Sequence, residues 1–204
     1  MILNELGLEK EIWLLDEKGN ILEPSLFGFP SDEMGFLIEI RSEHSPSVRD
    51  ILLSLEIIEE INRSKADRLG LQTIVKHQMD ITKEFQDYIY KKYRLDTFPD
   101  FTKNIYGARE SHHTGFRGDK ATAGLHVHFS RRNTSDRTSE IVQLPIEEIV
   151  RQMDNKFKDL IESSGRIPGE YEPKKHGFEY RSLPATAPIR EICRFGLSIL
   201  GKVS

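Results

Sequence analysis

Residues 124–130 read Gly-Leu-His-Val-His-Phe-Ser, and apolar and polar side chains alternate along them with a period of two. This alternation is typical of a β-strand, because successive side chains of a strand point to opposite faces of the sheet. Residues 7–15, 36–41 and 178–183 alternate in the same way. We therefore expect four strands, each with one mainly apolar face and one face that carries ionisable groups.

Helices are predicted around these strands. The clearest one follows a Ser45 cap and Pro46, because apolar residues recur at i, i+3 and i+4 until Gly70 supplies a stop. Three more helices are expected at residues 80–93, at residues 145–161 and from Pro188 onward. Polar loops are expected at residues 99–123, 131–139 and 164–177. Together the patterns predict an α+β protein in which helices pack on one face of an antiparallel sheet, as a single domain over residues 1–204.

Composition excludes several classes of protein. Hydrophobic residues make up 37% of the 204 residues, charged residues 30%, and the mean hydropathy is −0.48, without an apolar run of the roughly 20 residues that span a bilayer. We therefore expect no membrane partner. A net charge of −4 gives no basic field for nucleic acid. Cys193 is the one cysteine, which excludes an intramolecular disulfide, and the acidic N-terminal segment lacks a secretory signal, so we expect a cytoplasmic protein.

The polar faces of the four predicted strands are rich in metal-ligand side chains. They carry Glu9 with Glu11, Glu39 with Arg41, His126 with His128, and Glu179 with Arg181. If the strands are neighbours, the carboxylates lie roughly 6 to 8 Å apart, and each pair of like charges costs about 2 to 3 kcal/mol at an effective dielectric constant of 20. Such a surface needs positive charge among its carboxylates. Carboxylates with an occasional imidazole are typical ligands of Mg²⁺ or Mn²⁺ rather than of structural zinc, and arginines suit phosphate or carboxylate oxygens.

Four short motifs resemble one family. Residues 7–11, GLEKE, resemble the GxExE opening of the glutamate-cysteine ligase and carboxylate-amine ligase family. Residues 124–130, GLHVHFS, resemble its G-hydrophobic-H-x-[HN] strand, and residues 178–183, FEYRSL, resemble its [FI]-E-[FYV]-R-S-L strand. Residues 37–42, LIEIRS, fit its remaining acidic strand. Within this family the chain resembles the short phage-encoded ligases of the COOH·NH₂ type, a resemblance that implies the cytoplasm of a phage host.

This resemblance implies a curved antiparallel sheet, similar to the catalytic domain of glutamine synthetase, that forms half of an active-site funnel. It implies ATP and Mg²⁺ or Mn²⁺ as cofactors, with a small-molecule or peptide carboxylate and an amine as substrates. The γ-phosphoryl group would pass to the carboxylate, and the amine would then displace phosphate to form an amide. A half-funnel this small could need a second subunit, so a homo-oligomer is left open.

Site roles follow from the same resemblance, position by position. The implied metal ligands are Glu9, Glu11, Glu39, His126 and Glu179, and Glu43 is a candidate for a further acidic ligand near Glu39. Arg181, His128 and Arg41 are the candidate catalytic residues, and Arg181 would contact the transferring phosphate or the substrate carboxylate. Independently of the resemblance, Arg117 lies in a basic loop that also holds Arg109, His112, His113 and Lys120. This loop is either a solvated loop or a lid that closes over phosphate or a substrate carboxylate. Lys175, with Lys174 and His176, could likewise reach phosphate or form a solvated turn.

Other interpretations of these residues stay open. Each acidic or histidine pair could be a solvated or structural pair on the outer face of a sheet. Trp13 shares the face of Glu9 and could stack on a ligand or cap a second core. A metal-dependent hydrolase or phosphatase would use the same constellation with water as the nucleophile. A catalytically degenerate binding protein of the same fold is the third alternative.

Overall fold

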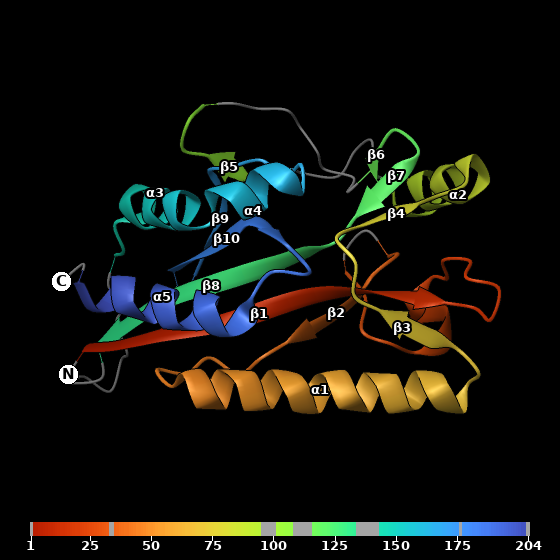
Figure 1. Ribbon diagram of the computed structural model, residues 1–204, viewed down its shortest axis with the longest axis horizontal. Helices are drawn as coiled ribbons and strands as arrows, with labels where there is room; N and C mark the ends of the chain where they lie inside the picture. Colours follow the sequence, from red (N-terminus) through yellow and green to blue (C-terminus); the bar gives the residue numbers. More distant parts are fainter. Residues whose placement is uncertain are drawn as a thin grey trace.

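The computed structural model describes residues 2–32, 35–94, 101–107, 116–133, 143–175 and 177–202. Within these ranges a seven-stranded antiparallel sheet is the largest feature (Figure 1). Its strands are β1 (Ile2–Leu15), β2 (Ile38–Arg41), β3 (Gln72–Ile74), β5 (Lys103–Asn104), β8 (Gly124–Asn133), β9 (Glu170–Lys174) and β10 (Gly177–Pro184). Their order is β2-β1-β8-β10-β9-β5, and β3 pairs with β1. The predicted α+β class with an antiparallel sheet is confirmed.

The four strands that the sequence predicts are consecutive neighbours in this sheet. Glu9 of β1 pairs with Arg41 of β2 on one side and with His126 of β8 on the other. His128 of β8 pairs in turn with Glu179 of β10. Because paired residues in an antiparallel sheet point to the same face, these registers bring all four polar faces to one surface.

Helices cover the apolar face of the sheet. They are α1 (Val48–Arg68), α3 (Ile146–Lys156), α4 (Lys158–Ser163) and α5 (Ile189–Lys202). The main core lies between these helices and the sheet and includes Leu8, Val127 and Phe178, each on the face that the alternation assigns to it. On this side the Tyr180 hydroxyl donates to Asp154 Oδ1 of α3 at 2.7 Å.

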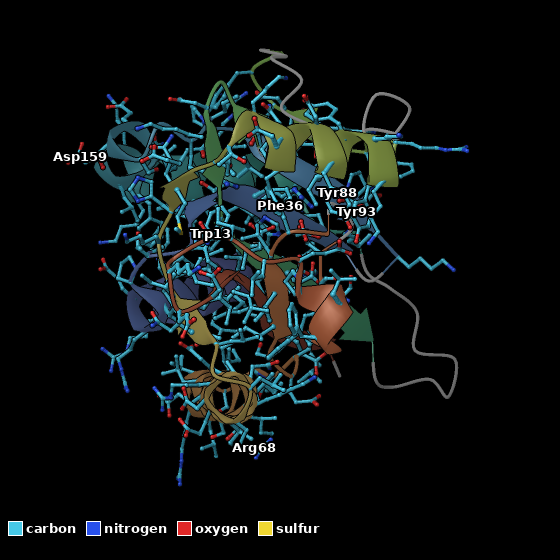
Figure 2. The ribbon with its side chains drawn as sticks, turned by 90° about the vertical axis from the view of Figure 1, so that its right-hand side faces the viewer. Trp13, Phe36, Arg68, Tyr88, Tyr93 and Asp159 are labelled. Atoms are coloured by element: carbon cyan, nitrogen blue, oxygen red, sulfur yellow. The ribbon has the colours of Figure 1, made fainter. Side chains whose placement is uncertain are left out.

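A second, smaller core lies on the other side of the sheet. It packs α2 (Lys83–Tyr93) and a three-stranded sheet of β4 (Gln78–Asp80), β7 (Lys120–Thr122) and β6 (Phe116–Arg117) against the end of β1. Trp13 and Phe36 are fully buried in it beneath α2 (Figure 2), and Trp13 Nε1 donates to the Lys76 carbonyl at 2.8 Å. We predicted that all helices lie on one face of the sheet. The structure differs, because α2 packs over Trp13, whose side chain lies on the polar face.

Several boundaries differ from the sequence expectations. Ser47 rather than Ser45 caps α1, because Ser45 is held in a bridge with Leu6. The helix expected over residues 145–161 is broken at Phe157 into α3 and α4. Phe36 does not share the face of Ile38, because β2 begins only at Ile38 and Phe36 lies in the preceding bend.

The predicted loops hold short strands. Strand β9 lies inside the segment 164–177, and β5, β6 and β7 lie inside the segment 99–123. Strand β8 continues to Asn133, into the loop expected at residues 131–139, whose remaining residues lie outside the described ranges. Among the described helices, none combines the length and the apolar character that crossing a bilayer requires.

Candidate metal centre

The polar face of the main sheet carries a buried cluster of acids and histidines. Glu9 and His126 lie opposite each other on β1 and β8, and Glu179 projects from β10 beside them. The exposed fractions of Glu9, His126 and Glu179 are only 4%, 2% and 1%. Ionised groups this deeply buried lose their hydration, so their charges must be compensated within the cluster.

His126 provides one part of that compensation. Its Nδ1 atom lies 2.9 Å from Glu9 Oε1 and 3.0 Å from Glu179 Oε1. Burial and the Arg181 charge disfavour an imidazolium, but the charges of Glu11 and Glu179 outweigh them and raise the pKa of His126 to about 9. At neutral pH a protonated imidazole therefore bridges two carboxylates.

The same histidine keeps its neighbouring carboxylates ionised. Burial opposes the charge on both Glu9 and Glu179, but hydrogen bonds and the charge of His126 lower the pKa of each well below its usual range. Hydrogen bonding with His128 lowers the pKa of Glu9 further. Two ionised carboxylates are thus available to bind a cation.

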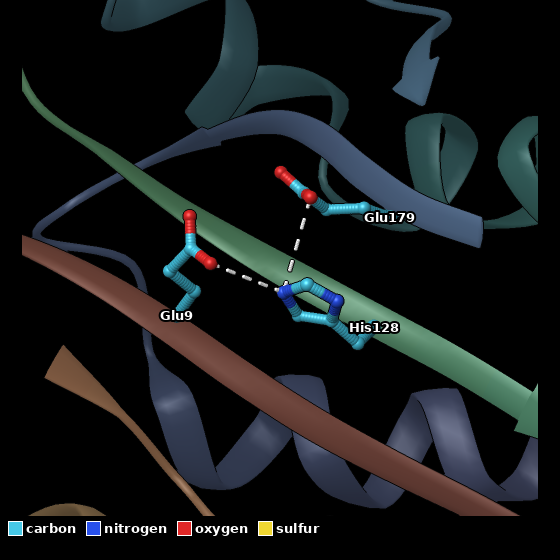
Figure 3. A group of neighbouring side chains, drawn as sticks. All are labelled: Glu9, His128 and Glu179. Carbon is cyan, nitrogen blue, oxygen red and sulfur yellow. Dashed lines mark ion pairs between the residues drawn. The ribbon is translucent and has the colours of Figure 1, made fainter. Parts of the chain in front are cut away.

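The second oxygen of each carboxylate faces His128. His128 Nε2 lies 3.4 Å from Glu9 Oε2 and 3.9 Å from Glu179 Oε2 (Figure 3). One potential ligand atom from each of Glu9, His128 and Glu179 lies within 4.8 Å of the others, and all three residues are buried. This triad has the composition and spacing to hold one divalent cation.

A second acidic group lies beside the triad. Glu39 is paired with Glu11 across β2 and β1, and Glu11 Oε2 accepts a hydrogen bond from the backbone N–H of Gly124. Burial and the charge of Glu9 raise the pKa of Glu39 to about 8. Glu39 therefore carries a proton at neutral pH, which reduces the repulsion between the carboxylates.

Asp32 joins this second group from the segment before β2. Its Oδ1 accepts from the backbone N–H groups of Phe36 and Leu37, both at 3.1 Å, while its Oδ2 is buried without a hydrogen-bond partner among the described residues. Burial, followed by the charge of Glu11, raises the pKa of Asp32 to about 7. A buried carboxylate oxygen without a donor fits a site built for a cation.

Basic side chains surround the carboxylates. Arg41 Nε lies 2.8 Å from Glu9 Oε2, and Arg41 also pairs with Glu39. Arg181 Nη1 lies 2.6 Å from Glu179 Oε1 and 3.0 Å from Glu172 Oε2. The Arg41 side chain is 66% exposed, so its guanidinium can leave the carboxylates for an anion in solvent.

The donor set fits Mg²⁺ or Mn²⁺. Carboxylate oxygens with one imidazole nitrogen suit hard divalent ions, and the carboxylates of the cluster raise the pKa of both Glu39 and His126, as expected where negative charge is in excess. The structure brings together all five predicted ligands, Glu9, Glu11, Glu39, His126 and Glu179, with the three candidate catalytic residues. Within the cluster, His128 is more exposed than His126 and faces one oxygen of Glu9 and one of Glu179. His126 lies between the other oxygens of the same two carboxylates.

Other predicted residues do not join the cluster. Lys175 is exposed in the turn after β9, and Glu43 is exposed beyond β2. Arg117 lies in β6 of the small sheet, with its side chain outside the described part of the structure. Arg109, His112, His113 and His176 also lie outside the described residues.

Two residues of the cluster, Asp32 and Glu172, were missed by the sequence interpretation, and Lys174 was considered only as a residue that could reach phosphate. Asp32 follows no periodic pattern, so only the fold reveals it. Glu172 and Lys174 lie on β9, where Glu170, Glu172 and Lys174 alternate with Tyr171, which packs on the main core. That period of two was visible in the segment interpreted as a loop.

Comparisons with known proteins identify no relative. No protein-family model matches this chain, and neither a curated protein nor a solved structure does.

Proposed function

We propose that this protein is an ATP-dependent carboxylate-amine ligase that forms an amide through an acyl phosphate and uses Mg²⁺ or Mn²⁺. The proposal rests on one observation. The four strands with family-like motifs are direct neighbours, β2-β1-β8-β10, and they turn their carboxylates, imidazoles and arginines to one surface, on which Glu9, His126 and Glu179 are buried. As part of the same proposal, we assign the sheet to the catalytic fold of glutamine synthetase and the glutamate-cysteine ligases.

The side chains suit phosphoryl transfer, which needs mainly positioning and neutralisation of charge. Glu9, His128 and Glu179 would hold one divalent ion, and Glu11, Asp32 and Glu39 would add further carboxylate oxygens beside it. Such ions, when bound, supply positive charge to phosphate oxygens. Arg41 and Arg181 would bind the transferring phosphoryl group or the substrate carboxylate, because a guanidinium binds two such oxygens at once.

Calorimetric titration with ATP, with and without Mg²⁺, tests the proposal. We expect binding that requires Mg²⁺ and that Glu179→Gln abolishes. Glu191→Gln is the matched control, because Glu191 is half exposed on α5 and pairs with Lys156 on the helical side of the sheet. Binding in both variants would contradict a nucleotide site on the acidic face.

Turnover distinguishes the ligase from its alternatives. Pools of carboxylates and amines would be screened for ADP release that depends on both, with amide formation followed by mass spectrometry. Release of phosphate from phosphate esters without an amine would indicate a hydrolase or phosphatase instead. Metal binding without ATP binding would indicate a degenerate binding protein.

A further inference from the structure

A lysine forms an ion pair with one of the candidate ligand oxygens. Lys174 Nζ lies 3.0 Å from Glu179 Oε2, the oxygen that also faces His128 Nε2 at 3.9 Å. The same ammonium lies 2.5 Å from Glu172 Oε1. An ammonium and a divalent cation repel each other, so they cannot both occupy Glu179 Oε2.

The strand pairing explains why Lys174 reaches this oxygen. β9 pairs with β10, which places Glu172 opposite Glu179 and Lys174 opposite Gly177. Glu179 is buried, whereas the Lys174 side chain is 29% exposed at the border of the cluster. Lys174 can therefore turn toward solvent, whereas Glu179 cannot.

Lys174 also has a second carboxylate to hold it near the site. Burial disfavours its charge, but the hydrogen bond to Glu172 and the charge of Glu179 raise the pKa of Lys174 above its usual value. It is thus an ammonium at neutral pH, and Glu172 can keep it at the edge of the cluster after it leaves Glu179.

We propose that Lys174 is a built-in counter-ion of the metal centre that a divalent cation displaces from Glu179, and that the displaced ammonium then binds a phosphate group beside the cation. This inference deepens the proposed function and rests on it for the identity of the site. It predicts that the cation and a polyphosphate bind cooperatively. The cation frees the Lys174 ammonium for phosphate, and a phosphate that holds this ammonium leaves Glu179 open to the cation.

Calorimetric titration with Mn²⁺ alone tests the first part of the proposal, the displacement of Lys174 by the cation. Lys174→Met should bind Mn²⁺ roughly tenfold more tightly than the natural protein, because an internal competitor is removed. Lys175→Met makes the same change in net charge at an exposed neighbour, and its affinity should stay within about twofold. Lys174→Arg, which keeps the positive charge, should retain the natural affinity.

Inorganic tripolyphosphate tests the second half. The Mn²⁺-loaded natural protein should bind it, and Lys174→Met should bind it roughly tenfold more weakly although it holds Mn²⁺ more tightly. Thermal unfolding would verify that each variant folds, and Lys174→Gln replaces Lys174→Met if that variant does not.

The outcomes separate this inference from the proposed function. Equal Mn²⁺ affinities of Lys174→Met and the natural protein, or equal gains in Lys174→Met and Lys175→Met, would overturn the role of Lys174 alone. Tighter Mn²⁺ binding in Lys174→Met without any ATP binding would support the counter-ion and overturn the ligase. Absence of Mn²⁺ binding in both proteins would overturn both.

Discussion

His126 Nδ1 lies 2.9 Å from Glu9 Oε1 at the centre of the polar sheet face. The same nitrogen lies 3.0 Å from Glu179 Oε1, so one imidazole joins two carboxylates from different strands. With a pKa of about 9, His126 carries a positive charge at neutral pH and compensates part of the negative charge of the cluster. Its neighbour His128 faces the other oxygen of each carboxylate, which gives the two histidines different tasks.

Substitution should separate these tasks. His126→Gln removes a buried positive charge between two carboxylates and should lower the free energy of unfolding by roughly 3 kcal/mol in EDTA. His128→Gln should change stability much less but weaken Mn²⁺ binding about tenfold or more. Urea unfolding and Mn²⁺ calorimetry measure the two effects, and a reversed pattern would make His126 the metal ligand instead.

Asp32→Asn tests the second acidic group. The variant keeps an oxygen for the Phe36 and Leu37 N–H groups and gains an amide donor beside Glu11, so the ion-free protein should be at least as stable at pH 8. Its Mn²⁺ affinity should fall about tenfold. Asp154→Asn is the control, because Asp154 is a buried aspartate that accepts from Tyr180 on the helical side. A loss of affinity in both variants would indicate an indirect effect.

The stability of the ion-free protein should fall as pH rises from about 5 to 9. Asp32 and Glu39 have folded-state pKa values of about 7 and about 8, above their ordinary values, so folding takes up protons in this window. The raised pKa of His126, about 9, adds stability that is complete below its ordinary value and lost as pH rises through the raised one. Thermal unfolding in EDTA across this range measures the trend, and a rising midpoint would contradict it.

Mn²⁺ affinity should show the opposite dependence. The cation competes with protons on Asp32 and Glu39, so its affinity should increase between about pH 6 and pH 9. Binding at pH 7 should release protons, which calorimetry in buffers of different ionisation enthalpy detects. A proton count of zero would show that the cation binds away from these two carboxylates.

Gly7→Ala tests the packing of the site. A methyl group on Gly7 would overlap the imidazole of His44, whose ring centroid lies 5.6 Å from that of His128. Overpacking of this kind costs about 1 to 3 kcal/mol. The double variant Gly7→Ala with His44→Ala should recover most of the loss in urea unfolding. Gly201→Ala in α5, where the added methyl meets open space, should not destabilise the protein.

Much of the fold could be predicted because its signals are local. Alternation in residues 7–15 and 124–130 identifies strands, and the apolar spacing before Gly70 identifies α1. The break at Phe157 and the cap at Ser47 could not be predicted, because each depends on what the segment packs against. Strand β9 was missed for a different reason, since its short alternation lies among turn residues.

For the site, the sequence determined that Glu9, Glu11, His126, His128, Glu179 and Arg181 lie on the faces opposite the core. Strand geometry fixes the direction of a side chain within a few residues, so this result needs no tertiary contact. Only the tertiary structure decided which atoms meet. The register of β1, β8 and β10 sets His126 between two carboxylates, the segment before β2 inserts Asp32, and the pairing of β9 brings Lys174 to Glu179. These contacts join segments far apart in the chain, and their distances depend on pairings that no local pattern encodes.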